Sequence, residues 1–260
     1  MTAAVAPTRL VLTGAGGAIG SALARAMRAA WPDTRLVLVD REAAPVEILA
    51  RELGAAETHL ADLAALDGLP DLIATIERGG AIDGLVNCAG IMHVRQVETW
   101  QWQDAQALLT VDLLAPLRLQ DLVVRGRVER GRGLIVNIAS MAGRVPLRGC
   151  AYYGAAKAGL AMASEIARAD LGRRGVRVRT VYPGPVRSLL EAGARADYGG
   201  GGLLGRLAPT GDPAELARRI LRAIHGGEPR VIYPRFYHLG WSAPNLSHRL
   251  ALSFGPTPVA

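Results

Sequence analysis

Cysteine and lysine are scarce in this chain of 260 residues, which contains two cysteines and a single lysine. Cys88 and Cys150 are too few for a disulfide framework, and they do not form the pattern of a metal site. We therefore expect a reduced, cytoplasmic protein that holds no metal.

Long apolar runs are also missing. No stretch reaches the ~18 uninterrupted apolar residues that a membrane span needs. Residues 1–9 lack the basic region and apolar run of a signal peptide, so we expect none. Aromatic residues make up only 5% of the chain, and its arginines are scattered although the net charge is +7. This composition does not favour binding to nucleic acid.

What the sequence does contain is an alternation of short apolar segments with longer segments of helical periodicity. The expected strands are 9–13, 35–39, 57–60, 83–86, 134–139, 176–182 and 230–233, and the expected helices are 18–30, 43–53, 66–77, 102–125 with a kink at Pro116, 151–171 and 213–225. Strands joined by such helices form right-handed crossovers and a parallel sheet. The pattern predicts an α/β fold, a single doubly wound Rossmann-type domain over residues 1–260, whose parallel seven-stranded sheet has helices on both faces.

Tyr153 and Lys157 stand four residues apart in the expected helix 151–171, so their side chains lie on one face, one turn apart. A nearby ammonium favours the phenolate, and we expect Lys157 to lower the pKa of Tyr153 enough for acid–base work near neutrality. Ser140, after the strand 134–139, can donate a hydrogen bond to a substrate oxygen beside the tyrosine.

Such a pair also arises by chance on amphipathic helices. The functional interpretation is favoured because Lys157 is the only lysine in the chain, whereas every other basic position is arginine. An ammonium is a compact donor on a flexible stem and is not equivalent to a guanidinium fork. Tyr152, five residues before the lysine, is expected to point elsewhere.

A glycine-rich segment, Thr13-Gly14-Ala15-Gly16-Gly17-Ala18-Ile19-Gly20, joins the first expected strand to the first expected helix. A doubly wound fold binds a dinucleotide pyrophosphate there, because glycines allow close approach and the helix N-terminus offers free N–H groups. The predicted cofactor-binding residues are Gly14, Gly16, Gly17, Ala18, Ile19 and Gly20. The alternative is a tight turn without a ligand.

Asp40 ends the second expected strand. A carboxylate at this place accepts hydrogen bonds from the hydroxyls of an adenosine ribose and repels a 2′-phosphate. It therefore favours NAD over NADP, although Arg41 can soften the preference. An aspartate at a strand end is otherwise an ordinary turn residue.

Together these residues resemble the short-chain dehydrogenase/reductase family over residues 8–190, with 8–188 as the cofactor and catalytic core. The resemblance is carried by the glycine-rich loop, Asp62-Leu63, Asn87-Cys88-Ala89-Gly90, Ser140, Tyr153 with Lys157, and the segment 183–188. It implies that Tyr153 exchanges the proton, Ser140 binds the substrate oxygen, and Lys157 binds the nicotinamide ribose. Further cofactor-binding residues that it implies are Asp62, Leu63, Asn87, Ala89, Gly90, Val111, Pro183, Gly184, Val186 and Ser188.

Four residues depart from the family pattern. Ala18 replaces a glycine, Cys88 an asparagine and Ser188 a threonine, while Asp112 stands where the family has a catalytic asparagine. Asp112, which we keep among the catalytic residues, could stabilise the Lys157 ammonium and preserve a proton relay. It could also draw the lysine away from the tyrosine and shift activity to alkaline pH, or mark a protein that has lost turnover.

Two segments follow the core. The resemblance fades after Ser188, but residues 189–212 stand where the family has its substrate lid, and we expect a mobile hinge at 199–202. The leucines of this region predict an apolar substrate, unless they only complete the core; they are Leu147, Leu189, Leu190, Leu203 and Leu204. The tail, residues 234–260, could pack on a neighbouring subunit, cover the site or rest on a membrane surface. Packing is the favoured role.

The sequence as a whole predicts an NAD-dependent oxidoreductase that interconverts a secondary alcohol and a ketone. A reductase of carrier-bound 3-oxoacyl groups is an alternative, and a nucleotide-sensing or scaffold protein without turnover is another. The resemblance implies a homo-oligomer, either a dimer or a tetramer, formed through the helices 102–125 and 151–171.

Overall fold

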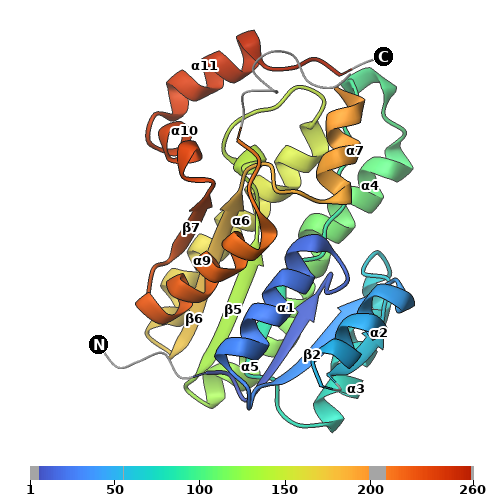
Figure 1. Ribbon diagram of the computed structural model, residues 1–260, viewed down its shortest axis with the longest axis vertical. Helices are drawn as coiled ribbons and strands as arrows, with labels where there is room; N and C mark the ends of the chain where they lie inside the picture. Colours follow the sequence, from blue (N-terminus) through green and yellow to red (C-terminus); the bar gives the residue numbers. More distant parts are fainter. Residues whose placement is uncertain (1–5, 55, 199–208, 259–260) are drawn as a thin grey trace.

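The computed structural model describes residues 6–54, 56–198 and 209–258. Within these ranges the chain forms one seven-stranded sheet, in which all neighbouring strands pair in parallel (Figure 1). The strands are β1 (Arg9–Thr13), β2 (Arg35–Asp40), β3 (Glu57–Leu60), β4 (Gly84–Asn87), β5 (Gly133–Ile138), β6 (Val176–Pro183) and β7 (Arg230–Tyr233). Their order is β3-β2-β1-β4-β5-β6-β7, which confirms the doubly wound fold.

Helices cover both faces of this sheet, as the alternating pattern predicts. They are α1 (Ala18–Ala30), α2 (Ala43–Glu52), α3 (Leu69–Arg78), α4 (Trp102–Leu109), α5 (Ala115–Glu129), α6 (Ala151–Gly172), α7 (Leu189–Asp197), α9 (Pro213–Gly226), α10 (His238–Ser242) and α11 (Pro244–Phe254). The helices α1, α2 and α9 pack on one face, and α3, α5 and α6 pack on the other.

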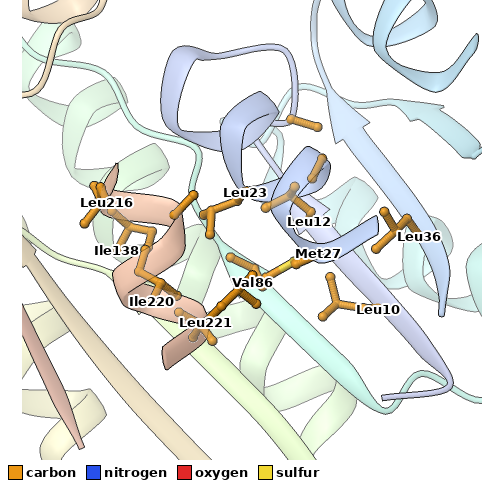
Figure 2. Close-up of a cluster of buried hydrophobic side chains, with 14 of the residues drawn as sticks. Leu10, Leu12, Leu23, Met27, Leu36, Val86, Ile138, Leu216, Ile220 and Leu221 are labelled. Carbon is orange, nitrogen blue, oxygen red and sulfur yellow. The ribbon is translucent and has the colours of Figure 1, made fainter. Parts of the chain in front are cut away.

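The largest buried cluster fixes α1 and α9 on the sheet (Figure 2). Leu10 and Leu12 of β1 face Leu23 and Met27 of α1, and Ile220 of α9 closes the cluster. Burying one such side chain completely contributes about 1.5–3 kcal/mol to folding. The packing holds α1 rigidly, and with it the glycine-rich loop that precedes the helix.

The expected helix 102–125 is not continuous. It consists of α4, a π-helical turn at Thr110–Leu114, and α5. The irregularity lies one turn before Pro116, where the kink is predicted, and this proline stands in the first turn of α5. Proline has no N–H to donate to the carbonyl of Asp112 four residues earlier, which favours a wider turn before it.

The described part of the tail packs on its own chain. It forms a 3-10 turn at Arg235–Tyr237, followed by α10 and α11. The ring of Trp241 contacts that of Tyr182, with 4.7 Å between centroids. The Tyr237 ring fills the space beside Gly184, since a Cβ on this glycine would lie only 2.6 Å from the ring. In the described ranges, no helix has the length and apolar character needed to cross a membrane.

Candidate active site

The strand order reverses at β1, and an open α/β sheet forms a crevice at the carboxyl ends of its strands where the order reverses, here those of β1 and β4. From β1 the chain moves outward to β2 and β3, and it then returns to place β4 on the other side of β1. Ligands of open α/β sheets bind at this kind of switch point. The glycine-rich loop follows β1, and the segment from Asn87 to Gly90 follows β4, so both sequence motifs meet here.

Close backbone contacts explain why two positions of the glycine-rich loop are occupied by glycine. Gly14 has a φ of 65°, and a Cβ there would lie 2.6 Å from the Cα of Ala89. A Cβ on Gly20 would lie 2.1 Å from the carbonyl oxygen of Gly14. The Thr13 hydroxyl accepts hydrogen bonds from the N–H groups of Cys88 and Ala89, at 3.1 and 3.3 Å. The two motifs are thus held together by the backbone itself.

The N-terminus of α1 fits an anionic group such as a pyrophosphate. Gly17 is the N-cap residue and supplies no side chain, and the first bond of the helix runs from Ser21 N–H to Gly17 O at 2.8 Å. The N–H groups of Ala18 and Ile19 precede that bond, at the positive end of the helix dipole. Ala18 is the first helical residue, so its methyl group is accommodated where the family has glycine.

Asp40 lies beside this loop. Its Oδ2 accepts a hydrogen bond from Gly16 N–H at 2.8 Å, and its Oδ1 accepts from the N–H groups of Arg41 and Glu42. The Arg41 guanidinium is turned towards Glu42, at 3.4 Å, instead of towards Asp40. The carboxylate is therefore fixed next to the phosphate-binding loop.

The predicted adenine-flanking pair lies at the end of β3. The Asp62 carboxylate accepts a hydrogen bond from Ala64 N–H at 2.9 Å, and the Leu63 side chain is packed into the core. Val111 lies in the π-helical turn and is partly buried. Asp62 and Leu63 follow β3, so they lie at the same carboxyl edge of the sheet as the glycine-rich loop that follows β1.

Ser140, Tyr153 and Lys157 come together at the carboxyl end of β5. The Lys157 Nζ lies 5.8 Å from the centroid of the Tyr153 ring and donates a hydrogen bond to the carbonyl of Ile138 at 3.2 Å. The Ser140 hydroxyl donates to the carbonyl of Pro183 at 3.4 Å. All three side chains are buried, so the arrangement expected from their spacing is present.

Asp112 reaches the same point from the π-helical turn. Its side chain is fully buried, its Oδ1 accepts a hydrogen bond from Ile91 N–H at 2.7 Å, and its Oδ2 lies 3.2 Å from the Lys157 Nζ. Gly90 packs against this ion pair, since a Cβ on it would lie 3.3 Å from both partners. A larger residue than glycine would require one of the two partners to shift by a few tenths of an ångström.

The pKa of the buried Tyr153 differs from the value expected from the sequence. The pKa of Tyr153 is raised, because burial outweighs the opposing effects of the Lys157 charge and a hydrogen bond with Ser140. The Asp112 charge raises it further. Lys157 does lower the Tyr153 pKa, as predicted, but burial outweighs this effect, so the pKa is not brought down towards neutrality. Spacing along a helix does not report the cost of burying a phenolate.

Burial also acts on the two partners of the ion pair. It raises the pKa of the Asp112 carboxyl, against the attraction of Lys157. Burial lowers the pKa of the Lys157 ammonium, but Asp112 and Tyr153 together bring it above its ordinary value. Lys157 consequently remains a cation over the physiological range.

A chain of polar side chains beneath the site was not anticipated. The Asn87 amide donates to Asn137 Oδ1 at 2.8 Å, and the Asn137 amide donates to the Ser164 hydroxyl at 2.8 Å. The chain ties β4 to β5 and to the catalytic helix α6. Ser164 lies seven residues after Lys157 on α6, and a polar residue on that buried helical face was the available signal.

The segment after β6 starts α7. Ser188 caps this helix by accepting a hydrogen bond from Glu191 N–H at 3.0 Å, and Val186 forms a bridge with Gly211. The hydroxyl retained at position 188 thus has a structural partner. Pro183 and Gly184 lie at the strand end, where Ser140 and the tail contact them.

The far end of α7 is attached to the loop before α6. The Tyr198 hydroxyl donates to the carbonyl of Arg148 at 2.6 Å and lies 3.3 Å from the Cys150 Sγ. Tyr198 and Ala194 pack in the same apolar cluster as Tyr153, so α7 forms a wall of the site. Sequence reasoning did not single out Tyr198 for this contact, because nothing local indicates a partner fifty residues away.

The leucines expected to face a substrate are exposed where they are described. Leu189 is 93% exposed, Leu190 38% and Leu147 37%, so these three do not complete the core. Leu203, Leu204 and the predicted hinge at 199–202 lie outside the described residues.

Comparison with known proteins agrees with this geometry. The family model of short chain dehydrogenases matches residues 8–199. D-threitol dehydrogenase of Mycolicibacterium smegmatis is 35% identical over 209 residues, which cover 77% of this chain and 78% of that protein.

Two solved structures show the same architecture. A gluconate 5-dehydrogenase of Burkholderia cenocepacia in complex with NADP and tartrate is 27% identical, with a TM-score of 0.77, and the match covers 86% of this chain and 92% of that one. An alcohol dehydrogenase of Comamonas testosteroni, specific for bulky-bulky ketones, is 25% identical with a TM-score of 0.77 and coverages of 96% and 95%. The chain belongs to the short-chain dehydrogenase family, and it is an oxidoreductase by that membership.

Proposed function

We propose that this enzyme interconverts a secondary alcohol and a ketone with NAD as the preferred cofactor, and that Tyr153 transfers the proton. The observation that carries the proposal is the buried contact of Ser140, Tyr153, Lys157 and Asp112 next to the glycine-rich crevice. A scaffold protein would have no reason to bury an ion pair beside a tyrosine at the carboxyl edge of the sheet.

The loop, Asp40 and the strand ends provide the places for a dinucleotide. The N–H groups at the start of α1 would bind the pyrophosphate, Asp40 the adenosine ribose, and Lys157 the nicotinamide ribose. The cofactor, when bound, supplies or accepts the hydride. This assignment of groups rests on the uncapped helix N-terminus and on the position of the Asp40 carboxylate.

The protein side of the reaction is acid–base chemistry. In alcohol oxidation the Tyr153 phenolate takes the hydroxyl proton of the substrate, and in ketone reduction the Tyr153 hydroxyl returns it. Ser140 holds the substrate oxygen by a hydrogen bond. Lys157 favours the phenolate, and the buried Asp112 keeps Lys157 charged.

Support for NAD comes from Asp40, whose carboxylate repels a 2′-phosphate. The guanidinium of Arg41, which could bind such a phosphate, is paired with Glu42. The Burkholderia relative was solved with NADP, so the preference for NAD is proposed on Asp40 and Arg41 of this chain alone.

An apolar substrate is favoured by the surroundings of Tyr153. The buried side chains of its cluster are Val94, Leu108, Ala142, Cys150, Ala156 and Ala194. Leu189, Leu190 and Leu147 leave further apolar surface exposed on α7 and on the loop before α6. The related Comamonas enzyme is specific for bulky ketones, in line with this choice.

The test is a substrate screen with the purified protein, following the absorbance of the reduced nicotinamide. We expect turnover of cyclic and long-chain secondary alcohols with NAD. A best kcat/KM on a polyol or a hydroxy acid would contradict the substrate class. Absence of turnover with every alcohol, ketone and carrier-bound 3-oxoacyl group, together with measurable NAD binding, would favour the nucleotide-sensing alternative.

A further inference from the structure

The C-terminal helix α11 presents its apolar side to solvent. Leu246, Leu250 and Phe254 are spaced four residues apart and form one stripe, in which they are 58%, 48% and 65% exposed. No residue of α11 is buried. A surface helix of a globular protein normally turns such a stripe towards the core.

Polar groups of α11 bind it to the rest of the protein. The Ser247 hydroxyl donates to the carbonyl of Gly240 in α10, and also to that of Pro244 in its own helix. The His248 ring lies 2.8 Å from the carbonyl of Arg144. The Arg148 guanidinium donates to the carbonyl of Leu252 at 2.5 Å. These contacts fix the orientation of the helix, so the outward stripe is a consequence of how α11 is held.

The preceding turn and α10 also expose apolar side chains. Phe236 is 58% exposed and Leu239 is 70% exposed, while Tyr237 and Trp241 from the same segment pack inward. In Figure 1, α10 and α11 lie on the outside of the molecule, beyond the carboxyl ends of the strands. The surface is therefore on the side of the molecule that holds the candidate active site.

The charged side chains of the tail, residues 234–260, are all basic. No aspartate or glutamate occurs after Glu228, whereas Arg235, Arg249 and two histidines of the tail are exposed. Arg249 lies on α11 between Leu246 and Leu250. An amphipathic helix with exposed leucine and phenylalanine flanked by arginine is suited to the interface of an anionic bilayer.

We infer that the tail surface, defined here as Phe236, Leu239, Leu246, Leu250 and Phe254 with Arg235 and Arg249, docks on an anionic phospholipid membrane. The apolar side chains enter the interface between headgroups and acyl chains, and the two arginines contact lipid phosphates. A second copy of the chain fits less well, because the tail has no acidic residue after Glu228 with which the exposed arginines of another tail could pair. The inference does not depend on which substrate the enzyme uses.

The experiment measures cosedimentation of the full chain with vesicles of phosphatidylcholine, alone or mixed with phosphatidylserine. We expect the wild type to bind the anionic vesicles and to be released by salt. The triple variant Leu246→Ser, Leu250→Ser, Phe254→Ser should bind them at least about tenfold more weakly, because it loses the apolar contact. Arg235→Glu with Arg249→Glu, which keeps the stripe, should weaken binding to anionic vesicles as well.

A matched control replaces exposed apolar residues elsewhere. Ile48→Ser with Leu60→Ser removes side chains that are 58% and 57% exposed on α2 and β3, and it should leave vesicle binding unchanged. Sedimentation velocity without lipid tests whether a second copy of the chain covers the tail surface instead. The inference is overturned if the wild type does not bind anionic vesicles, if the triple variant binds as well as the wild type, or if the triple variant forms smaller oligomers than the wild type.

Discussion

Asp112 is the residue whose chemistry differs most from the family pattern, and the structure selects between its possible effects on Lys157. The carboxylate lies 3.2 Å from the Lys157 Nζ, yet that ammonium remains 5.8 Å from the centroid of the Tyr153 ring. The lysine is therefore shared by both partners. The negative charge keeps Lys157 protonated and at the same time opposes the phenolate form of Tyr153.

A pH profile of Asp112→Asn tests this account. The raised pKa of Tyr153 places the rise of the oxidation rate at alkaline pH, because oxidation needs the phenolate and its fraction grows as pH approaches the pKa. The asparagine can still accept from Ile91 N–H but removes the charge, so the Tyr153 pKa falls and the rise moves to lower pH. The measurement is kcat/KM for alcohol oxidation against pH. A wild type that is inactive at every pH beside an active variant would show that the relay is broken.

The cofactor preference resides in Asp40. Wild-type enzyme should favour NAD over NADP by about tenfold or more in kcat/KM, because the Asp40 carboxylate repels the 2′-phosphate of NADP. Asp40→Ala should narrow this ratio, mainly by improving the use of NADP. The same variant loses the acceptor of Gly16 N–H, so some loss of NAD affinity is expected as well. Tighter binding of NADP than of NAD by the wild type would contradict the assignment.

Among the elements, the strands and the glycine-rich loop could be predicted because their signals are local. Each central strand is a short apolar run that is buried on both faces. The glycines of the loop stand between a strand and a helix, and this local pattern predicts a tight turn. The order of motifs along the chain then placed Ser140 and Tyr153 at one edge of the sheet. Once the strands are assigned, residues that follow them must lie at the same edge, because all strands of a parallel sheet end at that edge.

Other features could not be predicted because they depend on tertiary contacts. The π-helical turn at Thr110–Leu114 carries the buried Asp112 that pairs with Lys157, and no local propensity encodes that contact. The raised pKa of Tyr153 follows from burial, which spacing does not report. The outward stripe of α11 is set by polar contacts with residues about a hundred positions earlier, such as Arg144 and Arg148.

Gly14→Ala tests the close approach of the loop to β4. Gly14 and Gly54 both have positive φ, at 65° and 74°, but only Gly14 is crowded, whereas a Cβ on Gly54 meets nothing within 4 Å. Gly54→Ala should lower the free energy of unfolding by about 1 kcal/mol through backbone strain alone. Gly14→Ala should lower it further and weaken NAD binding. Denaturant unfolding and cofactor titration check both effects, and equal losses in the two variants would refute the packing argument.

At the scale of the whole molecule, exposed apolar residues on α6 support the expected assembly. Met162 and Ile166 are 64% and 55% exposed and lie four residues apart, on the helix through which a dimer or tetramer is predicted. Burial of such a pair in a symmetric contact removes it from water. Met162→Glu with Ile166→Glu should therefore yield a smaller species in sedimentation velocity. An unchanged mass would place the subunit contact elsewhere.

The central claim is that the buried Tyr153 supplies the proton in an alcohol–ketone conversion. The most direct measurement compares Tyr153→Phe with the wild type in steady-state oxidation of the best alcohol, alongside NAD titration of both proteins. The ring remains and only the proton donor is lost, so kcat should fall by about 10²–10⁴-fold while the Kd for NAD stays within about twofold. Near-normal turnover in Tyr153→Phe would contradict the account.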